Sequence, residues 1–551
     1  MRILVNRSAA ILLTLSALGA QLPILAQQAG AGGPTVQTKE GWLRGHIGDG
    51  VYEFLGIPYA QPPVGALRWR PPQAHLRWSG VRQATAYGNR CPQIFELGVF
   101  AGPPSYAEDC LFLNVVTPAV GSNSSLGRLP VILWIHGGGL FDGESNDYDG
   151  AALARHGVIV VTINYRLGLL GFVAHPALER EGVPFGNYGY LDQQLALQWV
   201  QRNIASFGGD PARVTVAGQS SGAASTVAHV ISPTAKGLFS RAIFQSGWSL
   251  DPSLAFSSLK DAEQQGVGFA QAAGCANQGD RIAECLRALS VEQILSIQGT
   301  TVANGPYTNP GGGIVDGTTV IEPPEAAFAS GRFNHMPIMN GWTRDESAFF
   351  VMTNEYYTGI SLAASDYAPS VTRTYGAPAF PANVVERVLA QYPLTEYQSA
   401  SQADIALSTD PALCGVPEAN QMLATQVPVY AYEFDDRNAP SYFPSMSFHP
   451  GAYHTGDIQY LFRSNHGGSL GHVQTLSPQQ LRLSEEMIDY WVNFARSGNP
   501  NGTRNSPWPR YTQTQPVYLS EDLGGAVTIS EGEYLVRHKC AFWKTISRSV
   551  Q

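Results

Sequence analysis

Residues 213–222 read Arg-Val-Thr-Val-Ala-Gly-Gln-Ser-Ser-Gly. The first five favour a buried strand, and the small residues at 223–230 favour a helix. Between them, residues 218–222 fit the pattern Gly-x-Ser-x-Gly. A serine on so sharp a strand-to-helix turn has a strained backbone, and the residues two before and two after it must be small. The stretch predicts a nucleophilic serine, Ser220, although the bare pattern also arises by chance in turns without a chemical role.

Further apolar runs extend this unit into a sheet. Residues 131–135 and 158–163 are almost continuously apolar or β-branched, and residues 191–204 place apolar side chains on one helical face. Such strands, separated by helix-length segments, are typical of a mostly parallel sheet covered on both faces. The later strands are expected at residues 241–245, 337–340 and 427–434.

Two long segments, residues 251–333 and 353–410, look helical and are expected as insertions over the top of the sheet. We find no internal repeat and no linker-like composition within the chain after residue 35. The sequence therefore predicts one catalytic domain over residues 36–551.

A glycine run follows the strand at 131–135, since residues 136–139 read His-Gly-Gly-Gly. Glycines let bare backbone N–H groups approach a substrate oxygen without an intervening Cβ. We expect the N–H groups of Gly138 and Gly139 to form an oxyanion hole with that of Ser221, at the start of the helix after Ser220. The alternative is a flexible turn.

Composition excludes some classes of protein. The 551 residues are 44% hydrophobic and 14% charged, which suits a large buried core. The formal net charge is −9, and no basic run is present, so a nucleic-acid partner is not expected.

The N-terminal residues suggest export. Residues 1–26 place Arg2 and Arg7 before a short apolar stretch and small residues, which is the layout of a cleaved signal peptide. The apolar stretch is too short to span a membrane, and no other run is long enough. We expect residues 27–35 to form a flexible leader and the protein to be secreted or periplasmic. A buried N-terminal helix is the alternative.

The chain has six cysteines. An even number in an exported chain predicts three disulfides, for which about 15 pairings are possible from spacing alone. Six free buried thiols are the alternative.

Four further segments carry a resemblance to a known family. They are residues 54–60 (Phe-Leu-Gly-Ile-Pro-Tyr-Ala), 108–115 (Glu-Asp-Cys-Leu-Phe-Leu-Asn-Val), 164–168 (Asn-Tyr-Arg-Leu-Gly) and 207–211 (Phe-Gly-Gly-Asp-Pro). With the motif at Ser220, the chain resembles the type-B carboxylesterases, a family that includes cholinesterases and some fungal lipases. The likeness extends from about Val36 to Trp543 and implies an α/β-hydrolase fold, a large twisted sheet with helices on both faces and helical insertions over the active site.

The resemblance implies the partners of Ser220. The family's acid matches Glu346, whereas the adjacent Asp345 would point the other way. The family's histidine matches His454 in Gly-Ala-Tyr-His-Thr-Gly-Asp, with His449 as the rival nearby. The order serine, acid, histidine is also that of α/β-hydrolases.

The resemblance also implies supporting features. It pairs Cys91 with Cys110, Cys275 with Cys285 and Cys414 with Cys540. It places structural ion pairs at Arg68–Glu108 and Arg166–Asp192, and it makes Ser246 a support for the acid and base.

The implied activity is hydrolysis of a small-molecule carboxylic ester through an acyl-enzyme, with no metal or cofactor. Gln219 replaces a glutamate that is frequent in the family, and the loop 92–109 lacks the cation-binding Trp of cholinesterases. We therefore expect neutral or anionic esters, polycarboxylate side-chain esters of a natural product being one such class. Phe95, Phe100 and Tyr106 are candidates for an aromatic wall, with packing as the alternative role.

Two other functions remain open from sequence alone. A non-catalytic binding or adhesion protein could keep the same fold, and an amidase or thioesterase could use the same three residues. The sequence predicts no oligomeric state.

Overall fold

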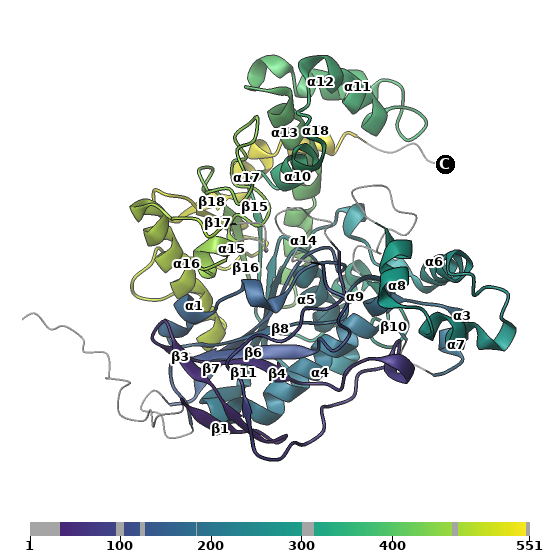
Figure 1. Cartoon of the computed structure of the whole chain (residues 1–551). Helices are drawn as coiled ribbons and strands as arrows, with labels where there is room; N and C mark the ends of the chain where they lie inside the picture. The colour runs from purple at the N-terminus through teal and green to yellow at the C-terminus, as the bar shows by residue number, and fades with distance from the viewer. Residues whose placement is uncertain are drawn as a thin grey trace, which may run out of the picture.

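The computed structural model describes residues 33–94, 104–121, 127–182, 185–299, 313–465 and 472–546 (Figure 1). The predicted signal peptide lies outside these residues. The predicted leader extends one residue too far, because Thr35 already pairs with Arg44 in a small sheet.

Within the described residues, eleven strands form one twisted sheet. Its central strands are parallel, and antiparallel pairs occur toward both edges. In spatial order the strands are β18 (Val527–Ser530), β17 (Val517–Glu521), β16 (Val429–Phe434), β15 (Ile338–Thr343), β12 (Arg241–Gln245), β11 (Gly209–Gln219), β7 (Leu129–Ile135), β8 (Ile159–Ile163), β6 (Phe112–Thr117), β4 (Val51–Pro58) and β3 (His46–Gly48). The mostly parallel sheet predicted from the apolar runs is confirmed.

Three smaller sheets flank this one. They comprise β1 (Thr35–Gln37), β2 (Trp42–Arg44) and β5 (Val81–Gln83); β9 (Phe172–Val173) and β10 (Gly186–Asn187); and β13 (Ser257–Ser258) and β14 (Ile314–Val315).

Both faces of the large sheet are buried, and β7 shows why its sequence is continuously apolar. Val131, Leu133 and Ile135 pack into one buried cluster, whereas Ile132 and Trp134 pack into the other. Alternate side chains of a strand point to opposite faces, so both faces need apolar residues when helices cover both. Helices α4 (Tyr188–Asn203) and α5 (Ser221–Ile231) contribute to the first cluster and α16 (Pro478–Ser497) to the second.

The predicted insertions are largely helical. Segment 251–333 contains α6 (Leu259–Ala272), α7 (Ile282–Arg287), α8 (Val291–Gln298) and α9 (Pro324–Ser330). The helical region predicted at 353–410 extends further at both ends. It comprises α10 (Ala348–Thr358), α11 (Ala364–Tyr375), α12 (Val384–Gln391) and α13 (Ala400–Leu413), which lie together at the top of Figure 1. The remaining α-helices are α1 (Ala151–Arg155), α2 (Gly168–Gly171), α3 (Pro176–Glu179), α14 (Val416–Ala424), α15 (Ile458–Leu461), α17 (Glu531–Arg537) and α18 (Cys540–Trp543).

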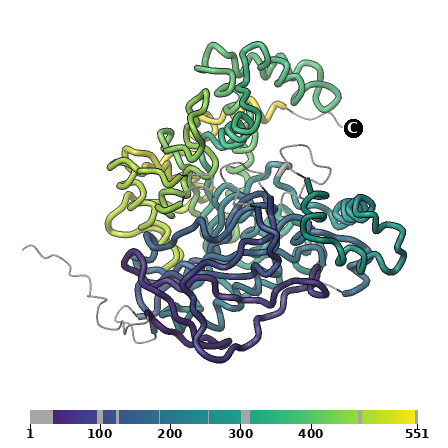
Figure 2. Tube along the Cα trace, viewed as in Figure 1, coloured from purple at the N-terminus to yellow at the C-terminus, as the bar shows by residue number. Residues whose placement is uncertain are grey.

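Three disulfides use all six cysteines. They join Cys91 to Cys110, Cys275 to Cys285 and Cys414 to Cys540, the pairs that the family resemblance implied. The third spans 126 residues and ties α18 to the end of α13, so that the C-terminal segment, yellow in Figure 2, lies beside the green helical insertion.

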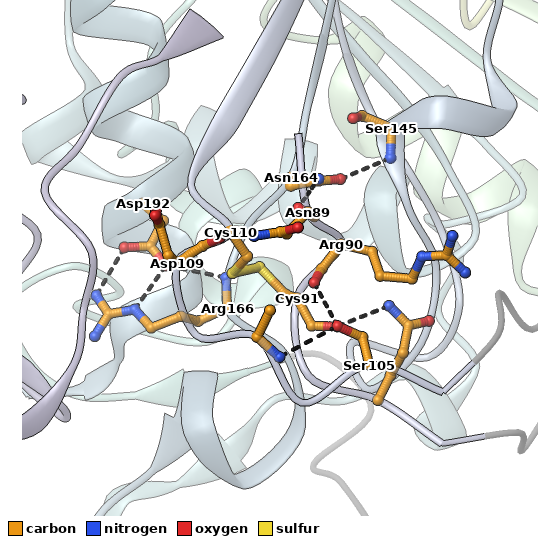
Figure 3. Close-up of a disulfide and its surroundings, with 12 residues drawn as sticks. Asn89, Arg90, Cys91, Ser105, Asp109, Cys110, Ser145, Asn164, Arg166 and Asp192 are labelled. Carbon is orange, nitrogen blue, oxygen red and sulfur yellow. Dashed lines mark hydrogen bonds and ion pairs between the residues drawn. A yellow bond between two sulfur atoms is a disulfide. The ribbon is translucent and has the colours of Figure 1, made fainter. Parts of the chain in front are cut away.

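Polar contacts fix the segment around the first disulfide (Figure 3). Arg166 and Asp192 form a buried ion pair, with Arg166 Nη2 2.7 Å from Asp192 Oδ1. Arg68 and Glu108 form the other expected pair, with a 2.6 Å separation. Arg166 lies just after β8, and the hydroxyl of its neighbour Tyr165 donates to the backbone carbonyl of His136, which begins the His-Gly-Gly-Gly stretch.

Candidate active site

Ser220 lies at the strained turn between β11 and α5. Its φ of 57° and ψ of −128° are unusual for a residue with a side chain. A Cβ added at Gly218 would lie 2.4 Å from the carbonyl carbon of Gly222, and one added at Gly222 would lie 2.1 Å from the carbonyl oxygen of Ile135. Only glycine therefore fits at either position, which explains the spacing of the sequence pattern.

The glycine run lies against this turn. Gly138 and Gly139 have φ of 100° and 63°, and a Cβ at Gly138 would lie 2.2 Å from the carbonyl oxygen of Asp142. The N–H of Leu140 donates to Ser221 Oγ at 3.1 Å and so links the loop to α5. Because Ser221 is the first residue of α5, its own N–H has no acceptor within that helix.

His454 and Glu346 form a buried hydrogen-bonded pair. His454 Nδ1 bonds to Glu346 Oε1, and each residue is about 5% exposed. The other carboxylate oxygen, Oε2, accepts hydrogen bonds from Ser246 Oγ at 3.1 Å and from Thr343 N at 3.1 Å. The Thr343 hydroxyl also donates to this oxygen. These donors satisfy the carboxylate and fix its orientation toward the imidazole.

The sheet topology explains how residues so far apart in sequence meet. Ser220 follows β11, Glu346 follows β15, and His454 lies in the segment after β16. These strands run parallel within the sheet, so their carboxyl ends share one edge.

Ser220 and His454 line the same two cavities, but no hydrogen bond joins them within the described residues. Instead, Gln219 Nε2 lies 3.1 Å from His454 Nε2, and Gln219 is 1% exposed. Hydrogen bonds between reacting groups are frequently long in unliganded sites and tighten when substrate binds. The position of Gln219 immediately before the nucleophile placed it near the reacting centre in the sequence, as a residue supporting the site, but its contact with His454 was not predicted.

The two rival residues have other surroundings. Asp345 pairs with Arg437 at 2.9 Å and accepts a hydrogen bond from the N–H of Ala452, so it points away from His454 as expected. His449 is exposed and accepts a hydrogen bond from the N–H of Gly451 at 3.2 Å.

A cavity of about 610 Å³ opens beside Ser220. Gly139, Ser221, Ser246, Glu346 and His454 line it together with Ser220, whereas Gly138 and Gln219 line a narrow pocket of about 40 Å³ next to Ser220 and His454. The large cavity is mainly walled by apolar side chains, which are Phe141, Leu254, Trp342, Phe349 and Phe350.

Two of these aromatic residues contact His454 directly, with ring centroids 5.7 Å apart in each case. Phe349 and Phe350 were not predicted as part of the site. The sequence feature that could have identified them is their position three and four residues after Glu346, about one helical turn away. Of the predicted wall residues, Phe95 and Phe100 lie outside the described residues. Tyr106 is 48% exposed and is not among the residues that line the cavity.

Two buried acidic side chains interact with each other, and one of them, Asp457, also interacts with His454. Burial raises the pKa of Asp457 to about 6, although the side-chain amide of Gln245 donates to it at 2.8 Å. Burial also raises the pKa of Glu521 well above its usual value, and the charge of Asp457 raises it further. Both side chains are almost completely buried.

No group of three or more His, Cys, Asp or Glu side chains in the described residues is arranged to hold a metal ion. None of the helices in the same residues has both the length and the apolar character that a membrane crossing requires.

Known proteins are similar to this chain in sequence and in fold. The profile of the carboxylesterase family matches residues 32–543. Human cocaine esterase is 34% identical, covering 90% of this chain and 87% of its own, and mouse acylcarnitine hydrolase is 34% identical, covering 94% and 92%. The solved structure of a PNB esterase matches with a TM-score of 0.72 and 31% identity over 92% of this chain and 99% of its own. The chain therefore belongs to the carboxylesterase family, and it is an α/β-hydrolase that cleaves carboxylic esters.

Proposed function

We propose that Ser220 is the nucleophile of this esterase, His454 the general base and Glu346 the acid that orients it. The observation that carries the proposal is the buried bond between His454 Nδ1 and Glu346 Oε1, beside a strained serine turn and in the same cavity. With Nδ1–H held by the carboxylate, Nε2 is the nitrogen left to accept a proton.

The reaction begins when Ser220 Oγ attacks the ester carbonyl carbon and His454 Nε2 takes the hydroxyl proton. The negative charge that develops on the carbonyl oxygen is stabilised by the N–H groups of Gly138, Gly139 and Ser221. Each such donor typically lowers the barrier by about 3 kcal/mol.

His454 then protonates the departing alcohol, which leaves an acyl group on Ser220. Water attacks this acyl-enzyme with His454 again acting as base, and the carboxylic acid is released. Substrate binding must replace the contact between Gln219 Nε2 and His454 Nε2 by one with Ser220 Oγ. Ser246 and Thr343 hold Glu346 through its second oxygen and keep it in place throughout the cycle.

Of the neutral and anionic esters expected from the sequence, we propose the neutral class. Among the described residues, those that line the large cavity include no Lys or Arg, and they include the carboxylates of Asp251 and Glu346. A polycarboxylate ester would have to bring further negative charge to this cavity without a compensating cation. Gln219, being neutral, also offers a cationic substrate no attraction.

We also propose that the protein is exported and that residues 36–551 act as one catalytic unit. The three disulfides support an oxidising compartment. The single large sheet, which carries Ser220, Glu346 and His454 at one edge, supports one unit.

The test is hydrolysis of matched aryl, alkyl, acylglycerol, choline and polycarboxylate esters by the wild type and Ser220→Ala. We expect hydrolysis of neutral esters that falls at least about 10⁴-fold in Ser220→Ala. Ser206→Ala is the matched control, because its hydroxyl donates to Gln37 and lines none of the cavities described.

Full turnover by Ser220→Ala would exclude this nucleophile. A preference for amides or thioesters over the matched oxygen esters would favour the amidase or thioesterase alternative. No turnover of any substrate by the wild type would favour a binding protein.

A further inference from the structure

A second cavity of about 390 Å³ adjoins the cavity beside Ser220. The two share the lining residues Ser347, Phe350, Asn354 and Ser408, so they lie next to each other. Residues of α10, α11 and α13 and of the loop 359–363 form its walls, and these helices lie together at the top of Figure 1. Nothing in the proposed ester chemistry needs this space.

The walls of the second cavity are rich in groups that both donate and accept hydrogen bonds. Five serine hydroxyls and one amide line it, along with two carboxylates and one guanidinium. These polar residues are Ser347, Ser361, Ser370, Ser401, Ser408, Asn354, Glu355, Asp404 and Arg373. The cavity beside Ser220 also has serines, an amide and carboxylates among its described lining residues, but it has no guanidinium there and has more large apolar side chains.

Two of the charged groups are not used by the fold. Among the described residues, neither the side chain of Asp404, in α13, nor that of Arg373, in α11, makes a hydrogen bond or a direct ion pair. Burial raises the pKa of Asp404, while Arg373 lowers it, so the two side chains influence each other across the cavity. Glu355 differs, because its two oxygens accept from the backbone N–H and the hydroxyl of Ser447, each at 2.7 Å.

Phe350 separates the two cavities. Its side chain is 57% exposed, although it is large and apolar, and its ring stacks on that of His454 at an interplanar angle of 27°. A substrate whose ester lies at Ser220 and whose remote end enters the second cavity would pass over this ring. An aromatic face suits the apolar C–H face of a ring that carries hydroxyls at its edge.

We propose that the second cavity binds a neutral polyhydroxylated, sugar-like group joined to the reacting ester, with Asp404 and Arg373 bonding its hydroxyls and Phe350 under its apolar face. A neutral polyol needs donors and acceptors together, and one free carboxylate beside one free guanidinium favours neither an anion nor a cation. The inference rests on the proposed function, because the sugar is bound as part of the ester.

The test compares a methyl ester with the 6-O-glucosyl ester of the same acid, using the wild type, Asp404→Ala and Arg373→Ala. We expect the wild type to prefer the glucosyl ester. Each variant should raise KM for that ester about 10-fold, which is the cost of losing one charged hydrogen bond, and should leave the methyl ester unchanged. Asp366→Ala and Arg482→Ala are matched controls, because both side chains are exposed and line neither cavity.

Other outcomes separate the alternatives. Equal KM changes for both esters, or no change for either, would overturn the sugar site. A requirement for Asp404 and Arg373 only with an amino-acid ester of the same acid would overturn it in favour of a zwitterion site. Failure of the wild type to cleave even the methyl ester would count against the proposed function itself, whereas normal cleavage with no glucosyl preference would count against the second cavity alone.

Discussion

Two buried histidines of this protein bond to carboxylates in different ways. His454 bonds to Glu346 through Nδ1 alone, and its Nε2 faces Gln219 at the edge of the active-site cavity. His538, which follows α17, is 2% exposed and has carboxylates at both nitrogens, with Asp410 3.0 Å from Nδ1 and Glu433 2.6 Å from Nε2.

The difference separates the proposed base, His454, from a structural cation, His538. Burial opposes the charge on His538, but Glu433 and Asp410 outweigh it and raise the pKa of His538 to about 9. Near neutral pH, His538 is therefore charged and has no nitrogen free to accept a proton. A strongly shifted histidine is a frequent sign of a functional site, yet here it holds the segment that carries Cys540 to the core.

The largest expected effect is on activity when His454 is replaced. His454→Ala should lower kcat by at least about 10⁴-fold, because the proposed base is lost. The melting temperature should change by much less than in His538→Ala. Steady-state kinetics with a neutral aryl ester and thermal unfolding of His454→Ala and His538→Ala test this contrast. Similar losses of activity in the two variants would contradict the different roles of the two histidines.

Replacing His538 should have the opposite effect, lowering stability while leaving activity unchanged. His538→Gln removes the cation that Asp410 and one oxygen of Glu433 contact, while Arg537 still pairs with the other oxygen of Glu433. This should lower the free energy of unfolding by about 3 kcal/mol. Turnover per folded molecule should remain normal. Denaturant unfolding measures the first quantity and active-site titration with kinetics the second; an unchanged unfolding midpoint would contradict the structural role.

The pH dependence of stability offers a finer separation. The folded-state pKa of His538 lies above the unfolded value, so its contribution is complete below pH 6.5 and is lost as pH rises through about 9. We expect a loss of about 3 kcal/mol over this window in the wild type. His538→Gln should lack this component, and parallel stability curves for the two proteins between these pH values would refute it.

The smallest expected effect concerns Glu521, a buried acid that has no histidine partner. Among the described residues, both of its carboxylate oxygens lack a hydrogen-bond partner. Its raised pKa means that folding becomes less favourable as pH rises above 4.5, where the unfolded carboxyl ionises first. Glu521→Gln should therefore raise stability at pH 8 by about 1 kcal/mol and have little effect at pH 4. Melting curves at the two pH values test this, with Glu433→Gln as the destabilising counterpart.

The sequence predicted the local parts of the site well. The run before Ser220, the glycines on both sides of it and the His-Gly-Gly-Gly stretch contain their own steric reasons, because those reasons involve backbone conformation within a few residues. The strand predicted at 241–245 coincides with β12. The strand predicted at 427–434 was placed two residues too early at its start, because β16 begins at Val429. Strand ends depend on pairing with neighbours, which single-strand patterns do not contain.

The choice between Asp345 and Glu346 could not be made from the local sequence. Asp345 and Glu346 are adjacent and chemically alike, and only the family resemblance distinguished them from sequence. In the structure, Arg437 forms an ion pair with Asp345, whereas Ser246 and Thr343 donate hydrogen bonds to Glu346 and orient it toward His454. Those partners come from separate strands and loops.

By itself, the sequence determined the parallel sheet, the strained turn at Ser220 and the glycine run, because short-range sterics and apolar periodicity specify them. Only the tertiary structure decided that Gln219 faces His454, that Phe350 stands between two cavities, and that Asp404 and Arg373 share the second one. These contacts depend on which strand ends and helices become neighbours. That is decided by long-range packing, which the residues of a single segment do not specify.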